Sequence, residues 1–319
     1  MTLFRFPFRA MGSPCELQLY AETRREAKAA AERAMADVAL LEARYSRYRA
    51  DSLLSTINAA AARGEPVEVD AETAALLDYA QTCYDRSDGL FDITAGVLRQ
   101  VWSFGSGGSS GSGSGSSSGR LPDAAEVAAV LGRVGWDKLR WHRPRLEFTV
   151  PAMELDLGGI VKEYAADRSG TLLLDLGIAQ GLVNLGGDIR VLGPHPDGRA
   201  WSIGIRHPHR PDALLGHILV RQGALASSGD YERCLDIDGR RYGHILDPRT
   251  GWPVEGLAAV SVLAPCCLIA GSASTIAMLK ASAGPAWLAG LGLQHLWVDQ
   301  AGHLGGNLRP SSGAEQGGA

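Results

Sequence analysis

Cysteine is scarce in this sequence, and none of it has the C-x-x-C spacing that many metal and redox sites use. The five cysteines stand at positions 15, 83, 234, 266 and 267. Their odd number speaks against a closed disulfide framework and favours a reducing compartment. Since Cys266 and Cys267 lie in an apolar run, we expect both to be small buried side chains rather than metal ligands or a vicinal bridge.

The sequence also lacks an excess of charge. Its 319 residues carry a formal net charge of −4, which provides no basic surface for nucleic acid or for an anionic membrane. The N-terminal stretch has Arg5 and Arg9 but lacks the apolar segment of a secretory signal. We therefore expect a cytoplasmic protein without a nucleic-acid partner.

A single uncharged run, 257–279, is long enough to span a bilayer. It contains Pro265, Gly271 and several hydroxyl residues, and its composition changes from β-branched to small residues. This pattern predicts a buried strand followed by a helix, without stable membrane insertion.

The remaining periodicity mixes helices and strands and shows no repeat of fixed length. Capping signals at Thr23, Asp70 and Asp123 predict three helices, the first of which runs to about Ala43. Further helices are expected over 159–176 and 272–281. Strands are expected over 14–20, 146–150, 182–192, 201–206, 216–226, 233–237, 241–246, 259–264 and 294–299. This order predicts an α+β fold with a large, mostly antiparallel sheet and packed helices.

Residues 105–119 consist only of glycine and serine. Such a segment cannot bury enough apolar surface to offset the entropy lost on ordering, so we expect a flexible surface loop. Trp102 and Phe104 precede it and Trp136 follows it, which indicates an insertion within one domain. That domain is expected to span 1–310, followed by a disordered tail over 311–319.

The segment "DLGGIVKEYAADR", 156–168, combines an acid, two bare glycines and a cation at the start of a predicted helix. If the helix begins at Gly159, its free amides favour an anion such as phosphate, and Lys162 lies on the same face. Asp156 suits a sugar hydroxyl, a base edge or a metal. Alternatively, Asp156 only caps the helix and Lys162 is solvated, and these residues alone slightly favour that interpretation.

A second segment, 227–254, concentrates charge in a predicted hairpin with an Asp238-Gly239 turn. Its polar residues are Asp230, Glu232, Arg233, Arg241, His244, Asp247, Arg249 and Thr250. A histidine among so many charges is suited to proton transfer near neutral pH. We predict His244 and Asp230 as catalytic residues.

Two shorter motifs complete the candidate site. Asp92 stands between apolar neighbours in "SDGLFDITAG", so its carboxylate must either bind something or cap a neighbouring turn. Gly186-Gly187 lies inside the strand expected over 182–192, which predicts a bulge or the close approach of a ligand.

These segments together resemble the ApbE-type flavin transferases (FAD:protein FMN transferases). The likeness lies in "FRAMGSP" (8–14), "YSRYRADSLLSTIN" (45–58), "SDGLFDITAGVL" (87–98), "DLGGIVKEYAADR" (156–168), "GLVNLGGDIRVLG" (181–193) and "SSGDYERCLDIDGRRYGHILDPRTGWPV" (227–254). The resemblance covers roughly 5–300 and implies a single T-fold-like domain.

The resemblance implies an enzyme that cleaves FAD and joins FMN to a threonine hydroxyl of an acceptor redox protein, with release of AMP. The residues that match the family's FAD contacts are Met11, Tyr48, Leu90, Phe91, Asp92, Asp156, Lys162 and His244. A Mg²⁺ ion is implied near the backbone of Gly159. The alternatives are hydrolysis of FAD to FMN and AMP, or binding of flavin without catalysis.

The family's metal motif reads approximately A-D-A-L-A-T, with its Asp and Thr as ligands. Here the matching "AGSAST" keeps Thr275 but has Gly271 in place of the acid, and Glu163 replaces the family's glycine after Lys162. Glu163 could therefore supply the missing metal ligand. The alternative, of equal weight, is that Glu163 points to solvent and pairs with an arginine.

Overall fold

One large antiparallel sheet runs through the structure, a computed structural model that describes residues 1–104, 120–210, 212–231 and 233–311. Its strand order is β1-β2-β6-β7-β10-β13-β14-β15, and each neighbouring pair is antiparallel. The strands are β1 Thr2–Ala10, β2 Ser13–Ala21, β6 Gly181–Leu185, β7 Asp188–Gly193, β10 Gly223–Gly229, β13 Leu257–Ala264, β14 Gln294–Asp299 and β15 Leu304–Gly306.

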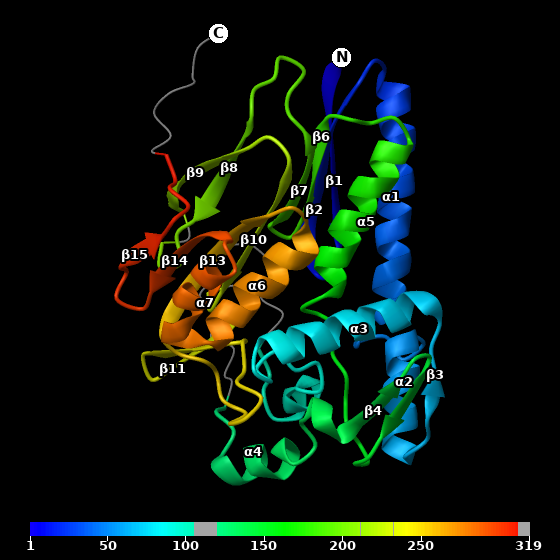
Figure 1. Cartoon of the computed structure of the whole chain (residues 1–319), viewed down its shortest axis with the longest axis vertical. Coiled ribbons are helices and arrows are strands. Elements are labelled where there is room, and N and C mark those ends of the chain that lie inside the picture. The colour runs from blue at the N-terminus through cyan, green and yellow to red at the C-terminus, as the bar shows by residue number, and fades with distance from the viewer. Residues whose placement is uncertain (105–119, 211, 232, 312–319) are drawn as a thin grey trace.

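Three helices pack on one face of this sheet (Figure 1). They are α1 Arg24–Tyr45, α5 Val161–Asp175 and α6 Cys267–Leu279. Helix α1 begins where predicted, because the Thr23 hydroxyl accepts a hydrogen bond from the Glu26 amide (3.2 Å). Its buried stripe is rich in alanine, which lets α1 lie close to the strands and to α5.

The opposite face of the sheet is covered by a hairpin of β8 Trp201–Arg206 and β9 Leu214–Val220. Successive residues of a strand point to opposite faces, and the main sheet shows this directly. Val191 packs with the hairpin residues Trp201 and Ile203, whereas its neighbour Leu192 packs with the helices. The central strands are therefore buried on both sides.

A second group of elements lies below the sheet and its helices in Figure 1. The helices are α2 Leu53–Arg63, α3 Ala71–Arg86 and α4 Ala124–Leu131, and the strands are β3 Val67–Glu68, β4 Leu139–His142 and β5 Arg145–Phe148. A hairpin of β11 Cys234–Ile237 and β12 Arg240–Gly243 packs through Leu235 against this group. The remaining helices are α7 Gly284–Gly290 and the 3₁₀ turns η1 Gly96–Gln100, η2 Trp136–Lys138 and η3 Ala281–Ala283.

The predicted α+β class and the large antiparallel sheet are confirmed. The run 257–279 is a buried strand and helix, β13 and α6, as expected. The five cysteines are free, and Cys267 is buried as expected, whereas Cys266 is only half-buried. Among the described residues, none of the helices combines the length and the apolar character that crossing a membrane requires.

Two expected strands were wrong, because each is a pair of strands joined by a turn. The segment expected as 182–192 folds as β6 and β7, and the segment expected as 216–226 belongs to β9 and β10. Gly186 and Gly187 form the first of these turns, with φ values of 61° and 99° that favour glycine. The Gly/Ser stretch 105–119 and positions 312–319 of the expected tail lie outside the described residues.

Candidate active site

The first wall of the candidate site is the two-residue turn between β1 and β2. Ala10 pairs with Ser13, and between them Met11 and Gly12 have φ values of 51° and 72°, as in a type I′ turn. A methionine in this left-handed region is strained, and the pairing of the two strands does not by itself require a methionine there. The turn holds Met11, a predicted flavin contact, at the end of the sheet.

A second turn, between β6 and β7, meets the first. A side chain on Gly186 would collide with Ser13, whose Cβ lies 2.7 Å from the position a Gly186 Cβ would take. The same position is 3.9 Å from Cδ of Lys162, so the glycine lets the lysine cross the turn. The Lys162 ammonium then pairs with Asp188 at 2.8 Å. Gly186-Gly187 thus forms a turn that Ser13 and Lys162 approach closely, rather than a bulge within one strand, and the close approach of a ligand stays a prediction.

Asp156 is held by an arginine from another part of the chain. Its carboxylate forms an ion pair with Arg47 and accepts a hydrogen bond from the Gly158 amide (2.9 Å). It does not cap α5, which begins at Val161 rather than at Gly159. Arg47 also donates to the Tyr48 hydroxyl (2.8 Å) and lies over its ring, 5.0 Å from the centroid. The Tyr48 side chain remains 76% exposed, which leaves ring surface for a ligand.

The segment Leu90–Asp92 forms the floor below Gly159. Leu90 and Phe91 are buried, and the Phe91 ring lies 3.3 Å from the position that a Gly159 Cβ would take. The Asp92 carboxylate accepts hydrogen bonds from the Thr94 amide (2.8 Å), the Thr94 hydroxyl (2.7 Å) and the Trp136 amide (2.9 Å). Of the two alternatives for Asp92, the structure shows the turn-capping one.

His244 lies directly after β12, opposite Arg233. Its Nδ1 is 3.2 Å from the Arg233 carbonyl oxygen, which can only accept, so Nδ1 carries the proton. The pKa of His244 is lowered to about 4, first because the ring is shielded from water and then because Arg233, Lys162 and Arg47 are positively charged. The neutral ring therefore has an unprotonated Nε2 at neutral pH.

Three cations from distant parts of the chain thus act on one histidine. Arg47 follows α1, Lys162 belongs to α5, and Arg233 precedes β11. The sequence had predicted Lys162 as a site residue, but it had not assigned roles to Arg47 or Arg233. Both lie inside the quoted motifs, and Arg47 also stands next to the predicted contact Tyr48, so these positions were the signal available. Such a group of cations is suited to a polyanionic substrate.

Glu163 is buried between α5, α6 and β7 rather than exposed to solvent. The Cβ that Gly271 lacks would lie within 3.0 Å of three Glu163 side-chain atoms, so the glycine makes room for the glutamate. The pKa of Glu163 is raised to about 8, first by burial and then by the neighbouring Asp188 carboxylate. Its Oε2 is buried without a hydrogen-bond partner among the described residues. The solvent-exposed alternative for Glu163 was therefore wrong.

Asp230 has a partner other than His244. Its Oδ2 accepts a hydrogen bond from the Gln300 side chain (2.6 Å), and the described contacts do not join it to His244. Burial raises the pKa of its carboxyl group. A catalytic role for Asp230 stays a prediction.

Comparison with known proteins decides the family. The model of the ApbE family matches residues 11–297. The chain belongs to the ApbE family. It is 33% identical over 257 residues to the FAD:protein FMN transferase of Klebsiella pneumoniae, covering 79% of this chain and 75% of that protein. Over 300 residues it is 30% identical to the FAD:protein FMN transferase of Treponema pallidum, covering 85% and 79%.

Solved ApbE structures show the same fold. The ApbE protein of Thermotoga maritima superposes with a TM-score of 0.84 at 30% identity, covering 96% of this chain and 97% of that one. The apo form of the flavinyl transferase ApbE of Pseudomonas stutzeri gives a TM-score of 0.80 at 29% identity, covering 95% and 93%.

The residues near Gly271 fit the Mg²⁺ that the ApbE resemblance implies. Within the described ranges, no three His, Cys, Asp or Glu side chains are grouped so as to hold a metal by themselves. Mg²⁺, however, is usually bound by one or two carboxylates together with substrate phosphates and water. The buried, unpartnered Glu163 oxygen and the adjacent Asp188 meet that requirement. Thr275 lies one helical turn after Gly271, and its hydroxyl is 2.9 Å from that of Ser228.

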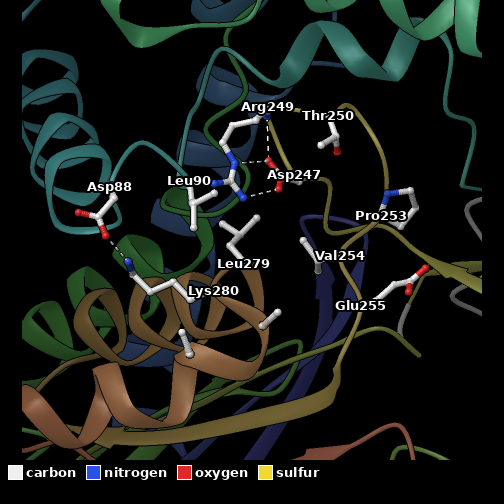
Figure 2. A pocket seen from close by; sticks show the side chains of 12 residues that line it. Asp88, Leu90, Asp247, Arg249, Thr250, Pro253, Val254, Glu255, Leu279 and Lys280 are labelled. Atoms are coloured by element: carbon white, nitrogen blue, oxygen red, sulfur yellow. Dashed lines mark hydrogen bonds and ion pairs between the residues drawn. The ribbon is translucent and has the colours of Figure 1, made fainter.

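A cavity of about 420 Å³ adjoins the ApbE site (Figure 2). Leu90 is the residue it shares with the predicted flavin contacts. Two of its ion pairs are internal, since Lys280 pairs with Asp88 (2.6 Å) and Arg249 with Asp247 (2.7 Å). Because these charges are matched within the wall, the cavity lacks the unbalanced positive charge found around His244.

Proposed function

We propose that this protein transfers FMN from FAD to a threonine hydroxyl of an acceptor redox protein and releases AMP. The observation that carries the proposal is His244, whose Nδ1 contacts the Arg233 carbonyl so that the neutral ring has an unprotonated Nε2, under the positive charges of Arg47, Lys162 and Arg233. A base that is unprotonated at neutral pH, beside cations suited to phosphates, matches phosphoryl transfer from a dinucleotide. Five free cysteines accord with a reducing compartment, so we place the reaction in the cytoplasm.

The proposed step begins with the acceptor hydroxyl next to His244. Nε2 takes the hydroxyl proton as the oxygen attacks the phosphorus of the FMN half. A phosphodiester bond forms, the bond from that phosphorus to the bridging oxygen breaks, and AMP leaves with that oxygen. The positive charges of Lys162 and the two arginines stabilise the charge on the phosphate oxygens. This is the main task in phosphoryl transfer, which needs little covalent help from the protein.

The remaining predicted contacts would position FAD. Met11 and the exposed ring of Tyr48 are available to the ring systems of the dinucleotide, and Leu90 and Phe91 provide an apolar floor. Asp156 is suited to a hydroxyl or base edge beside Lys162. Asp92 contributes through its three hydrogen bonds, which fix the backbone of this floor.

A Mg²⁺ ion would be held here by Glu163, with Thr275 and the Gly159 backbone as further ligands, and would neutralise phosphate charge when bound. Glu163 would supply the carboxylate that is missing at position 271, because its side chain occupies the space above Gly271. A binding test separates this role from catalysis: Mn²⁺ titrated into FAD-loaded protein should bind to the wild type and much more weakly to Glu163→Gln. Equal affinity of the two would contradict the assignment.

Incubation with FAD and Mg²⁺, with and without a threonine-bearing acceptor, tests the proposed function. We expect fluorescent flavin to stay on the denatured acceptor, its mass to increase by one FMN phosphodiester, and AMP to appear in equal amount. His244→Ala should reduce transfer by about 10²–10⁴-fold while FAD still binds. Free FMN and AMP without labelled acceptor would indicate hydrolysis instead. Bound FAD that stays intact would indicate a flavin-binding protein.

A further inference from the structure

The β11–β12 hairpin places Arg233 and His244 opposite each other. Asp238 and Gly239 form its two-residue turn, with φ values of 51° and 77°. In the two strands, Ile237 lies opposite Arg240, and at the other end Cys234 lies opposite Gly243. The next position in this ladder pairs Arg233 with His244. Because a shift of register by one residue would send alternate side chains to the other face, the turn fixes which residue faces the histidine.

The backbone carbonyl and the guanidinium of Arg233 make separate contacts. Its carbonyl oxygen accepts the Nδ1 hydrogen of His244 at 3.2 Å. Its guanidinium extends in another direction, where Nη2 lies 3.9 Å from the position a Gly12 Cβ would take, beside the Met11-Gly12 turn. Arg233 therefore bridges the proposed base and the wall predicted to hold the dinucleotide.

The guanidinium is also available for a substrate. Arg233 is exposed, and within the described part of the chain its guanidinium has no carboxylate partner. Arg47 differs, because it is paired with Asp156, and Lys162 is paired with Asp188. A planar guanidinium can give two parallel hydrogen bonds to phosphate oxygens, which an ammonium cannot.

We propose that Arg233 is a further catalytic residue of the proposed transfer, whose guanidinium binds the phosphoryl group being transferred while its carbonyl holds His244 with Nδ1 protonated. The guanidinium role rests on the proposed function, whereas the contact with His244 does not. The charged groups that act on His244 are Arg233, Lys162 and Arg47, and of these the hairpin supplies Arg233.

Side-chain substitution separates the two roles, because every variant keeps the carbonyl. Arg233→Gln should reduce kcat for FMN transfer by about 10²-fold, as for loss of one transition-state donor, with less than about tenfold change in the FAD dissociation constant. Arg233→Lys should recover part of kcat, since it restores charge but not the two-donor fork. Arg240→Gln is the matched control, because Arg240 lies in the same hairpin but pairs with Glu255.

A second readout does not depend on turnover. NMR titration of the His244 ring should show a higher pKa in Arg233→Gln than in wild type or Arg240→Gln, because a nearby positive charge is removed. In every variant Nδ1 should stay protonated in the neutral ring.

The outcomes can be told apart. Wild-type kcat in Arg233→Gln, or an equal loss in Arg240→Gln, would overturn the catalytic role. A loss of FAD affinity as large as the loss of kcat would make Arg233 a ground-state binding residue and would also overturn it. If the wild type labels no acceptor, the proposed function fails, and the NMR titration still decides whether Arg233 acts on His244.

Discussion

At the scale of single residues, two carboxylates of the candidate site behave in opposite ways. Asp92 is half-buried and accepts three hydrogen bonds from the protein, so its charge is satisfied within the fold. Glu163 is buried, but one of its oxygens has no partner among the described residues. Natural proteins rarely leave such an atom unpaired without a ligand or a functional reason. Asp92 therefore stabilises the local backbone, whereas Glu163 has an oxygen that can bind a ligand.

The Glu163 side chain fills the space that a side chain at position 271 would need, which gives a prediction about stability. Gly271→Ala should lower the free energy of unfolding by about 1–3 kcal/mol, because its Cβ would overlap Glu163 in a packed interior. Glu163→Gly should remove most of that penalty when the two changes are combined. Denaturant unfolding of the four proteins of this cycle measures the coupling. Additive effects of the two substitutions would show that the side chains do not compete for this space.

The low pKa of His244 sets the pH dependence of the proposed reaction. A base works when it is neutral, so the rate of FMN transfer should be level from neutral pH down to about pH 5. It should then fall as the pH passes through about 4, where His244 becomes protonated. Single-turnover rates across this range measure the profile. A decline already centred near pH 6.5, the value of an unperturbed histidine, would show that the ring is not shielded as described.

At the scale of elements, turns between strands position several of the candidate site residues. Met11 adopts a left-handed conformation at the tip of the β1–β2 hairpin. Met11→Gly should therefore stabilise the fold by up to about 1 kcal/mol, because glycine adopts a positive φ without strain, and it should at the same time weaken FAD binding. Thermal unfolding and FAD titration measure the two effects. Met11→Ala is the control, since it keeps the strain but loses the side chain that would contact flavin.

Helices were easier to predict than strand ends in this chain. Thr23, Asp70 and Asp123 each accept a hydrogen bond from the third residue of their helix, as their sequence signals indicated. The segments 182–192 and 216–226 were harder, because buried strands on both sides of a turn read as one apolar run. The sequence patterns described above predict neither strand β1 nor the helices α2 and α7.

At the scale of the whole molecule, the sequence indicated which segments form the site but not how they pair. The residues that the family motifs marked do meet, since Lys162, Asp156, His244 and the Met11 turn lie around one another. The Asp156–Arg47 and Lys162–Asp188 pairs depend on contacts between distant segments, which local periodicity does not contain. The same holds for the packing of Glu163 against Gly271.

Because the site joins the sheet, α5 and the lower group of elements, its ligand should stabilise the entire fold. FAD at 100 times its dissociation constant should add about 2.7 kcal/mol to the free energy of unfolding. Riboflavin, which lacks the pyrophosphate, should bind more weakly and raise the melting temperature less at equal concentration. Calorimetry with both ligands measures this difference. Equal affinities would contradict a site built on Arg47, Lys162 and Arg233.

The packing of Glu163 over Gly271 also links two positions that lie more than a hundred residues apart in the sequence. The space above position 271 holds one side chain, and in this protein α5 supplies it. An aspartate at position 271 therefore requires a smaller residue at position 163. The two positions cannot be changed independently, although nothing in the local sequence of either one indicates the other.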